Sequence, residues 1–133
     1  MRRDARDTAF RYLFSTIFQD GNDLQDDIYD FNFLNEQDKK FCNDLIALVL
    51  EHREEFLNIL DDISLNFKVE RMFLTDKTIL LIAMAEMKYI SDIPNVVSIN
   101  EAISLGKQYS SEDSVVFING ILAKFNKEIT ENV

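Results

Sequence analysis

The sequence predicts an all-α protein, and two features of the chain carry this prediction. Only 3 Gly and 1 Pro occur among 133 residues, of which 47% are hydrophobic, so few residues suit the many tight turns of a β architecture. Apolar residues instead recur at helical spacing in one segment after another. A chain of this length suits one compact domain with a sizeable core. We therefore expect a single helical unit.

The first helix is expected from about Arg2 to Gln19, because apolar residues cover much of its surface. One row at strict i+4 spacing contains Phe10, Phe14 and Phe18. The neighbouring flank contains Ala5, Ala9, Tyr12 and Leu13. This helix should be central to the N-terminal part of the fold.

Three arginines stand at the start of this helix. Arg2, Arg3 and Arg6 fall on one side of its first two turns. They form either an ordinary solvated terminus or a small positive patch that contacts phosphates, and the pattern alone leaves both interpretations open.

An acidic stretch follows the first helix, which Gly21 and Asn22 break. Residues 20–38 hold seven acids and no base. We expect a solvated loop here, with one short helical turn near Leu24 to Tyr29. Its charge lies away from the arginines in sequence.

Two helices are expected next. The first starts at Glu36, is capped by Asn35, and runs to about Glu51. The second places apolar residues at helical spacing at Phe56, Ile59, Leu60, Ile63 and Phe67. Neither segment carries residues that suggest chemistry.

Thr75 should cap the following helix, and Ile79–Ala85 is apolar all the way round. Such a helix is buried on every side, so we expect it at the centre of the C-terminal half. Ile93-Pro94 ends this helix, because the residue before proline is pushed towards extended geometry.

A capping box at Ser98–Glu101 predicts the start of the next helix, which ends within residues 108–111. Ser110 or Ser111 should cap a last helix, with acids in its first turn. The buried stripe of that helix contains Ile118, Ile121, Leu122 and Phe125.

Phe117 lies on the shoulder of that stripe, because successive residues turn about 100° around a helix. Its ring is either covered by a neighbouring helix or partly exposed and able to stack on a base.

Composition limits the possible functions. The N-terminus has no apolar signal segment and no long uncharged apolar run exists, so we expect a cytoplasmic protein. One cysteine, Cys42, and one histidine, His52, allow neither an internal disulfide nor a zinc cluster. We interpret Cys42 as a core residue and His52 as a surface residue near a helix end. The sequence contains no set of a nucleophile with its general base and no glycine-rich loop that could hold a phosphate. We therefore expect a binding protein without catalytic residues, metal or cofactor.

The C-terminal motifs resemble those of the NusB family of bacterial transcription antitermination factors. The resemblance rests on Ile93-Pro94, Val97–Ala102, Glu112–Ser114 and Phe117–Leu122, and more weakly on the RRxAR start formed by Arg2, Arg3, Ala5 and Arg6. It implies a fold of two small packed helical bundles with about seven helices. The N-terminal half would span about 1–73 and the C-terminal half about 74–133.

The resemblance also implies a function. Members of this family bind single-stranded boxA RNA together with NusE, a small-subunit ribosomal protein, in an antitermination complex with RNA polymerase and other Nus factors that supports ribosomal RNA transcription. By motif position, the RNA-binding residues would be Arg2, Arg3, Arg6, Lys107, Asp113, Ser114 and Phe117. The residues that bind the protein partner would be Phe14, Phe18 and Asp76, although Phe14 and Phe18 equally suit a core.

Three departures from the family pattern, at Asp4, Leu81 and Val116, reduce positive charge or replace an arginine. With a formal net charge of −10, they predict weak RNA binding by the chain alone. Two alternatives follow. One is a helical adaptor that keeps only the protein partner. The other is the NusB-like RNA-binding domain of an RNA cytosine methyltransferase.

Overall fold

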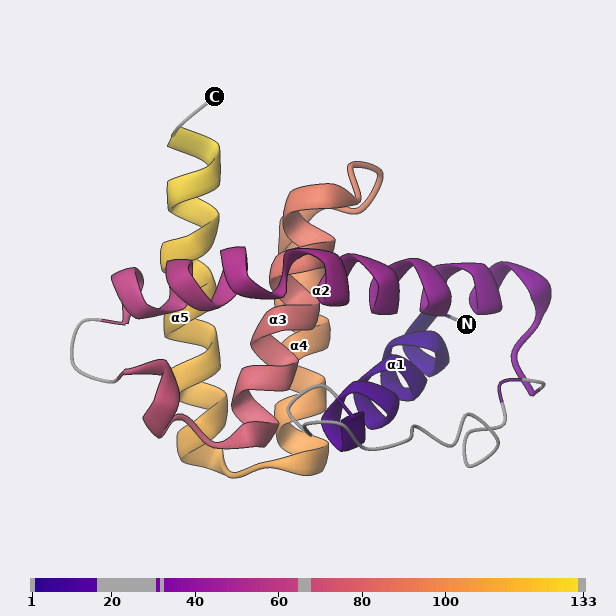
Figure 1. Ribbon diagram of the computed structural model, residues 1–133, viewed down its shortest axis with the longest axis horizontal. Coiled ribbons are helices and arrows are strands. Elements are labelled where there is room, and N and C mark those ends of the chain that lie inside the picture. The colour runs from indigo at the N-terminus through magenta and orange to yellow at the C-terminus, as the bar shows by residue number, and fades with distance from the viewer. Residues whose placement is uncertain (1, 17–30, 32, 65–67, 132–133) are drawn as a thin grey trace.

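The computed structural model describes residues 2–16, 31, 33–64 and 68–131, and these residues are helical with no β-strand (Figure 1). The helices are α1 (Arg2–Thr16), α2 (Glu36–Ile63), α3 (Leu74–Tyr89), α4 (Asn95–Tyr109) and α5 (Glu112–Glu131), with a 3-10 turn, η2 (Val69–Arg71), before α3. The all-α prediction is confirmed. The expected count of about seven is wrong for the described residues, which contain five α-helices.

The second and third expected helices are one kinked helix, α2. His52 marks the kink, because its backbone departs from helical geometry with φ −107° and ψ 15°. Its ring stacks on Tyr89 of α3, with 4.0 Å between ring centroids. The kink lies next to Glu51, where the first of the two expected helices was predicted to end, so the place near a helix end is confirmed. His52 is half-buried, which corrects the prediction of a surface residue.

Helix α3 is the centre of the fold, as its apolar sequence predicts. Every residue from Thr78 to Met87 is buried, and α1, α2, α4 and α5 all contact α3. In Figure 1, α2 crosses the front of α3 and α5, while α1 lies beside α3 on the opposite side from α5. The predicted stripe of α5 is buried as well, and so is Cys42. The division into halves at residue 73 stays a prediction.

Two predicted helix caps are confirmed. The Asn35 side chain accepts a hydrogen bond from the Asp38 amide at 2.8 Å, which caps α2. The Ser111 hydroxyl accepts from the Ser114 amide at 3.1 Å and caps α5. Thr75, in contrast, lies inside the first turn of α3, and Phe73 holds the cap position without a side-chain hydrogen bond.

The capping box predicted at Ser98 is wrong, because α4 begins three residues earlier, at Asn95. The Pro94 carbonyl accepts from the amides of Val97 and Ser98, so the Ser98 amide is already engaged. Glu101 reaches a different partner, Arg3 of α1. A tertiary ion pair has replaced the local cap.

Several predictions fall on residues outside the described ranges: the end of the first helix at Gln19, the break at Gly21 and Asn22, the short helical turn near Leu24 to Tyr29, and the places of Phe18 and Phe67. In the described part of the chain, no helix is long and apolar enough to cross a membrane.

Candidate nucleic-acid interface

Helices α1 and α4 lie side by side and run in the same direction (Figure 1). Arg3, in the first turn of α1, donates two hydrogen bonds of 3.1 Å each to the carboxylate of Glu101 in the middle of α4. Phe10, further along α1, stacks on Tyr109 at the end of α4, with ring centroids 4.6 Å apart. We call this α1–α4 surface the seam, and it carries several of the predicted site residues.

Arg2 and Arg3, two exposed arginines at the start of α1, are both paired with acids. Arg2 donates to Asp92 at 3.4 Å, and its guanidinium lies 4.8 Å from the centre of the Phe41 ring. Arg3 is exposed, and its hydrogen bonds to Glu101 raise the pKa of its guanidinium. A phosphate at this surface therefore competes with carboxylates.

Arg6 differs from the expectation of an exposed phosphate contact. It is only 5% exposed and donates two hydrogen bonds to Glu86 of α3, one of them 2.9 Å long. The sequence held a sign of this pair. Glu86 lies in a helix that is apolar on all sides, and a buried carboxylate requires a charged or hydrogen-bonding partner.

Tyr109 closes the other end of the seam. Its hydroxyl donates to the Asp7 carboxylate of α1. Burial and this hydrogen bond together raise the pKa of Tyr109 to about 12. The end of α4 is thus held to α1 by one polar contact and one aromatic stack.

A pocket of about 400 Å³ opens where the N-terminal ends of α3 and α5 meet. Its lining contains Met72, Phe73, Asp76, Ser111, Asp113, Ser114 and Phe117. The volume lies within the ~300–1,000 Å³ typical of small-ligand pockets. Three residues predicted from the family pattern to bind RNA, Asp113, Ser114 and Phe117, therefore converge on a single hollow.

The three pocket residues that were predicted to bind RNA differ in exposure. Asp113 is exposed and Phe117 is half-buried, so the ring is neither fully covered nor fully free. Ser114 is buried, and its hydroxyl donates to Asp76 at 2.9 Å. Ser114 therefore supports the pocket from behind rather than presenting its hydroxyl outward.

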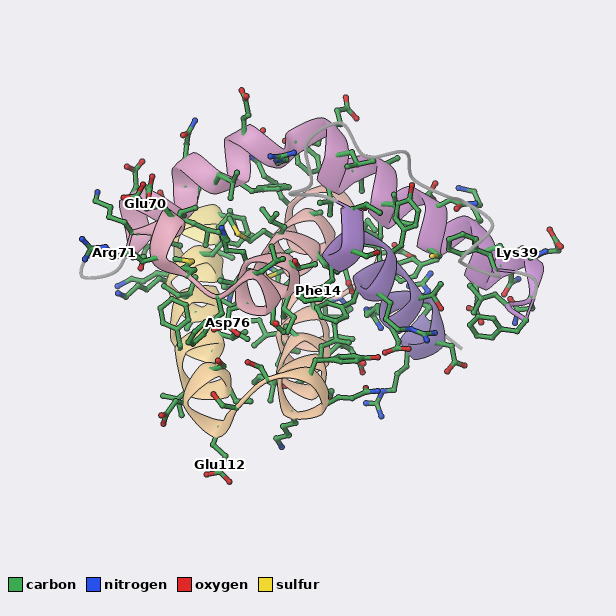
Figure 2. The ribbon with its side chains drawn as sticks, turned by 60° about the horizontal axis from the view of Figure 1, so that its bottom comes forward. Phe14, Lys39, Glu70, Arg71, Asp76 and Glu112 are labelled. Atoms are coloured by element: carbon green, nitrogen blue, oxygen red, sulfur yellow. The ribbon has the colours of Figure 1, made fainter. Side chains whose placement is uncertain are left out.

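Asp76 is a buried anchor between three elements. It accepts hydrogen bonds from Ser110 at 3.0 Å and from Ser114 at 2.9 Å, while being only 3% exposed. The connection from α4 to α5 is thereby tied to the start of α3. Figure 2 places Asp76 there, at the end of the molecule where Phe14 also lies near the end of α1.

Phe14 is the outer member of an aromatic row. It stacks on the buried Phe10 with ring centroids 5.7 Å apart, and Phe10 stacks in turn on Tyr109. Phe14 itself is 38% exposed. This exposure leaves part of its ring available to a partner, whereas Phe10 belongs to the core.

Lys107 is exposed on the last turn of α4, between the arginine end of the seam and the pocket. Nine residues separate Glu101 from Ser110, about 14 Å along the axis at ~1.5 Å per residue. This axial distance is within reach of a short stretch of single strand.

Sequence reasoning missed Phe73. Its ring is 69% exposed at the mouth of the pocket. A feature of the nearby sequence could have identified it, because a phenylalanine directly precedes a strongly predicted helix, where a capping residue is normally found.

The chain matches the model of the NusB family over residues 3–127. It is 34% identical, over 93% of its length and 98% of the relative's, to the transcription antitermination protein NusB of Agathobacter rectalis. Identity to the NusB of Desulforamulus reducens is 38%, over 92% of this chain and 87% of that one.

Among solved structures, T. maritima NusB superposes with a TM-score of 0.89 at 28% identity, covering 96% of this chain and 92% of the other. A crystal structure of the antitermination factors NusB and NusE in complex with dsRNA matches with a TM-score of 0.83 at 22% identity, covering 96% of each chain. This second likeness concerns the fold alone.

Proposed function

The chain belongs to the NusB family, and we propose that it acts as a transcription antitermination factor that binds single-stranded boxA RNA together with NusE. The observation that carries the proposal is the match along nearly the full length of relatives named transcription antitermination proteins. These relatives are named as antitermination factors and not as enzymes, which also favours a binding function over methyl transfer. The complex would include RNA polymerase and other Nus factors and support ribosomal RNA transcription in the cytoplasm.

The α1–α4 seam and the pocket are the RNA-binding surface of this proposal. Arg2, Arg3 and Lys107 contact phosphates along the seam. Phe117 stacks on a base, and Asp113 accepts hydrogen bonds from base edges. Arg6 supports this surface from inside through Glu86, and Ser114 supports it through Asp76.

Binding by the chain alone should be weak. The net charge of −10 repels RNA at long range, and Arg2 and Arg3 must leave Asp92 and Glu101 to reach phosphates. NusE, as a basic ribosomal protein, would offset this repulsion. Phe14 is the exposed contact for NusE, with Phe18 and the buried Asp76 as further candidates by motif position.

The test is fluorescence anisotropy of a labelled boxA RNA titrated with this protein, with and without NusE, against a scrambled RNA of the same length. The expected result is selective binding to boxA that tightens when NusE is present. Equal affinity for both RNAs in both conditions would contradict the proposal.

One alternative has a specific observation in its favour. Because the arginines are paired or buried, a helical adaptor that binds NusE without RNA selectivity also fits. Capture of NusE in the same experiment, without preference for boxA, would identify that function.

A further inference from the structure

Phe73 holds a position that costs the fold stability. It is the N-cap residue of α3 and makes no side-chain cap hydrogen bond, although Ser, Thr, Asp or Asn at this position satisfies a free amide of the first turn. Its ring is 69% exposed and so buries little apolar surface in return. A residue that breaks a local rule without a structural gain is a candidate for function.

The position of the ring indicates what that function is. Phe73 and Phe117 line the same pocket, one from the start of α3 and the other from α5, and Met72, the residue before Phe73, lines it as well. Most of this lining is apolar. Unstacked bases of single-stranded RNA are flat, and aromatic side chains are their usual stacking partners.

The polar group at the mouth of the pocket selects among possible ligands. Asp113 is exposed and makes no hydrogen bond or ion pair with any other residue that the structure describes. Its carboxylate only accepts hydrogen bonds and repels phosphate. An exocyclic amino group donates to such a carboxylate, as cytosine does to aspartate or glutamate.

Resting on the proposed function, we propose that Phe73 is a second stacking residue, which together with Phe117 holds one RNA base that bears an exocyclic amino group. Asp113 accepts a hydrogen bond from that amino group. Uracil fits less well, because its N–H is flanked by two carbonyl oxygens that the carboxylate repels. The occupant is a base rather than a peptide, because the exposed Lys107, a phosphate contact of the proposed function, lies in the last turn of α4, just before the turn whose Ser111 lines the pocket.

The test is a double-mutant cycle between Phe73→Ala and an abasic site introduced at each position of a labelled boxA RNA in turn, measured by anisotropy with NusE present. Phe73→Ala should weaken binding of the intact RNA about fivefold or more, up to about 150-fold. At one RNA position, removing the base should reduce the RNA affinity of the wild type much more than that of Phe73→Ala. At that position cytosine should bind more tightly than uracil, and Asp113→Asn should reduce this preference.

A matched control is Phe33→Ala. Phe33 is also exposed, at 59%, and precedes the start of α2, on the opposite side of Figure 1 from the segment between η2 and α3. Phe33→Ala should leave the affinity for boxA RNA unchanged. Because Phe73 is mostly exposed, both variants should fold, which circular dichroism and the unfolding midpoint would show.

Two results would overturn the inference without touching the proposed function. The first is wild-type selectivity for boxA with no position coupled to Phe73. The second is a Phe73→Ala variant that loses NusE in the absence of RNA but keeps its RNA affinity, which would assign the ring to the protein partner. If wild type shows no preference for boxA over scrambled RNA, the proposed function itself fails.

Discussion

Arg6 and Glu86 form a buried two-point ion pair between α1 and α3, across a sequence separation of 80 residues. The guanidinium also lies 5.2 Å from the centre of the Phe41 ring of α2. Three helices of the fold thus meet at one side chain. The pair joins the N-terminal helices to the central helix, and it removes from the proposed RNA-binding surface an arginine that its sequence position had assigned there.

Removing one member of this pair should be strongly destabilising. Glu86→Gln or Arg6→Met leaves a buried charge without its counter-charge, and each should lower the free energy of unfolding by about 3–5 kcal/mol. The double variant Arg6→Met/Glu86→Leu should recover most of that loss. Urea denaturation measures all three. Arg3→Ala, at an exposed position, is the control and should lower the free energy of unfolding far less than either single variant. If Glu86→Gln and Arg6→Met lower the free energy of unfolding no more than Arg3→Ala does, a structural role for the pair is contradicted.

Releasing Arg3 should strengthen RNA binding. Glu101→Gln removes the carboxylate that holds the guanidinium, and we expect affinity for boxA RNA to rise about two- to fivefold, a small gain because the pair is exposed. Glu128→Gln near the end of α5 changes the net charge equally and is the matched control. Equal gains from both variants would show that only the net charge matters.

The salt dependence of binding should count the phosphate contacts. Three contacts, from Arg2, Arg3 and Lys107, predict a slope of log affinity against log salt of about −2, at about 0.7 per phosphate on a single strand. Arg3→Ala should reduce the slope to about −1.4. Titrations at several salt concentrations measure it, and a slope unaffected by Arg3→Ala would remove this residue from the interface.

Tyr109 should make stability fall in alkaline solution. Its pKa is about 12 in the folded protein and ~10 in an unfolded chain, so folding favours the protonated phenol. This stabilisation is fully present below pH ~10 and is lost as the pH rises to about 12. The difference in unfolding free energy between wild type and Tyr109→Phe should therefore shrink across this range. The tyrosinate absorbance that distinguishes the two proteins should appear near pH 12, and its appearance near pH 10 would refute the assignment.

Cys42 should be unreactive until the protein unfolds. It is fully buried, and burial raises the pKa of its thiol to about 11, so almost no thiolate exists at neutral pH. A thiol reagent such as DTNB should react slowly with the native protein and rapidly in concentrated urea. Rapid reaction in native buffer would indicate that the α2 core opens locally.

The two helical glycines should respond oppositely to alanine. A Cβ on Gly120 meets no atom within 4 Å, so Gly120→Ala should stabilise the protein by about 0.5–1 kcal/mol through helix propensity. A Cβ on Gly106 comes 3.2 Å from Val115 Cγ2, at the contact between α4 and α5. That crowding should cancel the gain at Gly106. Thermal unfolding measures both, and equal stabilisation at the two sites would mean that α5 shifts to accommodate the methyl group.

The regular part of the fold could be predicted from sequence because apolar periodicity determines which helix faces are buried. The α5 stripe and the all-round burial of α3 followed from spacing alone, and the Asn35 cap followed from residue type. The break beside Glu51 was predicted, but the sequence could not show that the ring of His52 stacks on Tyr89, because this is a long-range contact. Likewise, Glu101 satisfied a local capping pattern but bonds to Arg3 from another helix.

The motif predicted which segment of the chain would line the pocket, but it could not predict the contacts of the individual side chains. Motif order groups Asp113 and Phe117 in one segment, and both line the pocket. Spacing could not show that Arg6 turns inward, since i+4 neighbours share a face whether that face is exposed or buried. Phe73 lies far from the motif in sequence and joins the pocket only because α3 and α5 start at the same end of the molecule.

Asp76 accepts hydrogen bonds from two hydroxyl groups, and these bonds affect how an RNA strand would bind. Ser110 and Ser114 lie on either side of the turn that joins α4 to α5, so a single carboxylate fixes that turn before any ligand arrives. The protein side of the interface is therefore preorganised, and the entropy lost on association falls mainly on the flexible strand. Sequence changes in the strand should then act mostly on the dissociation rate.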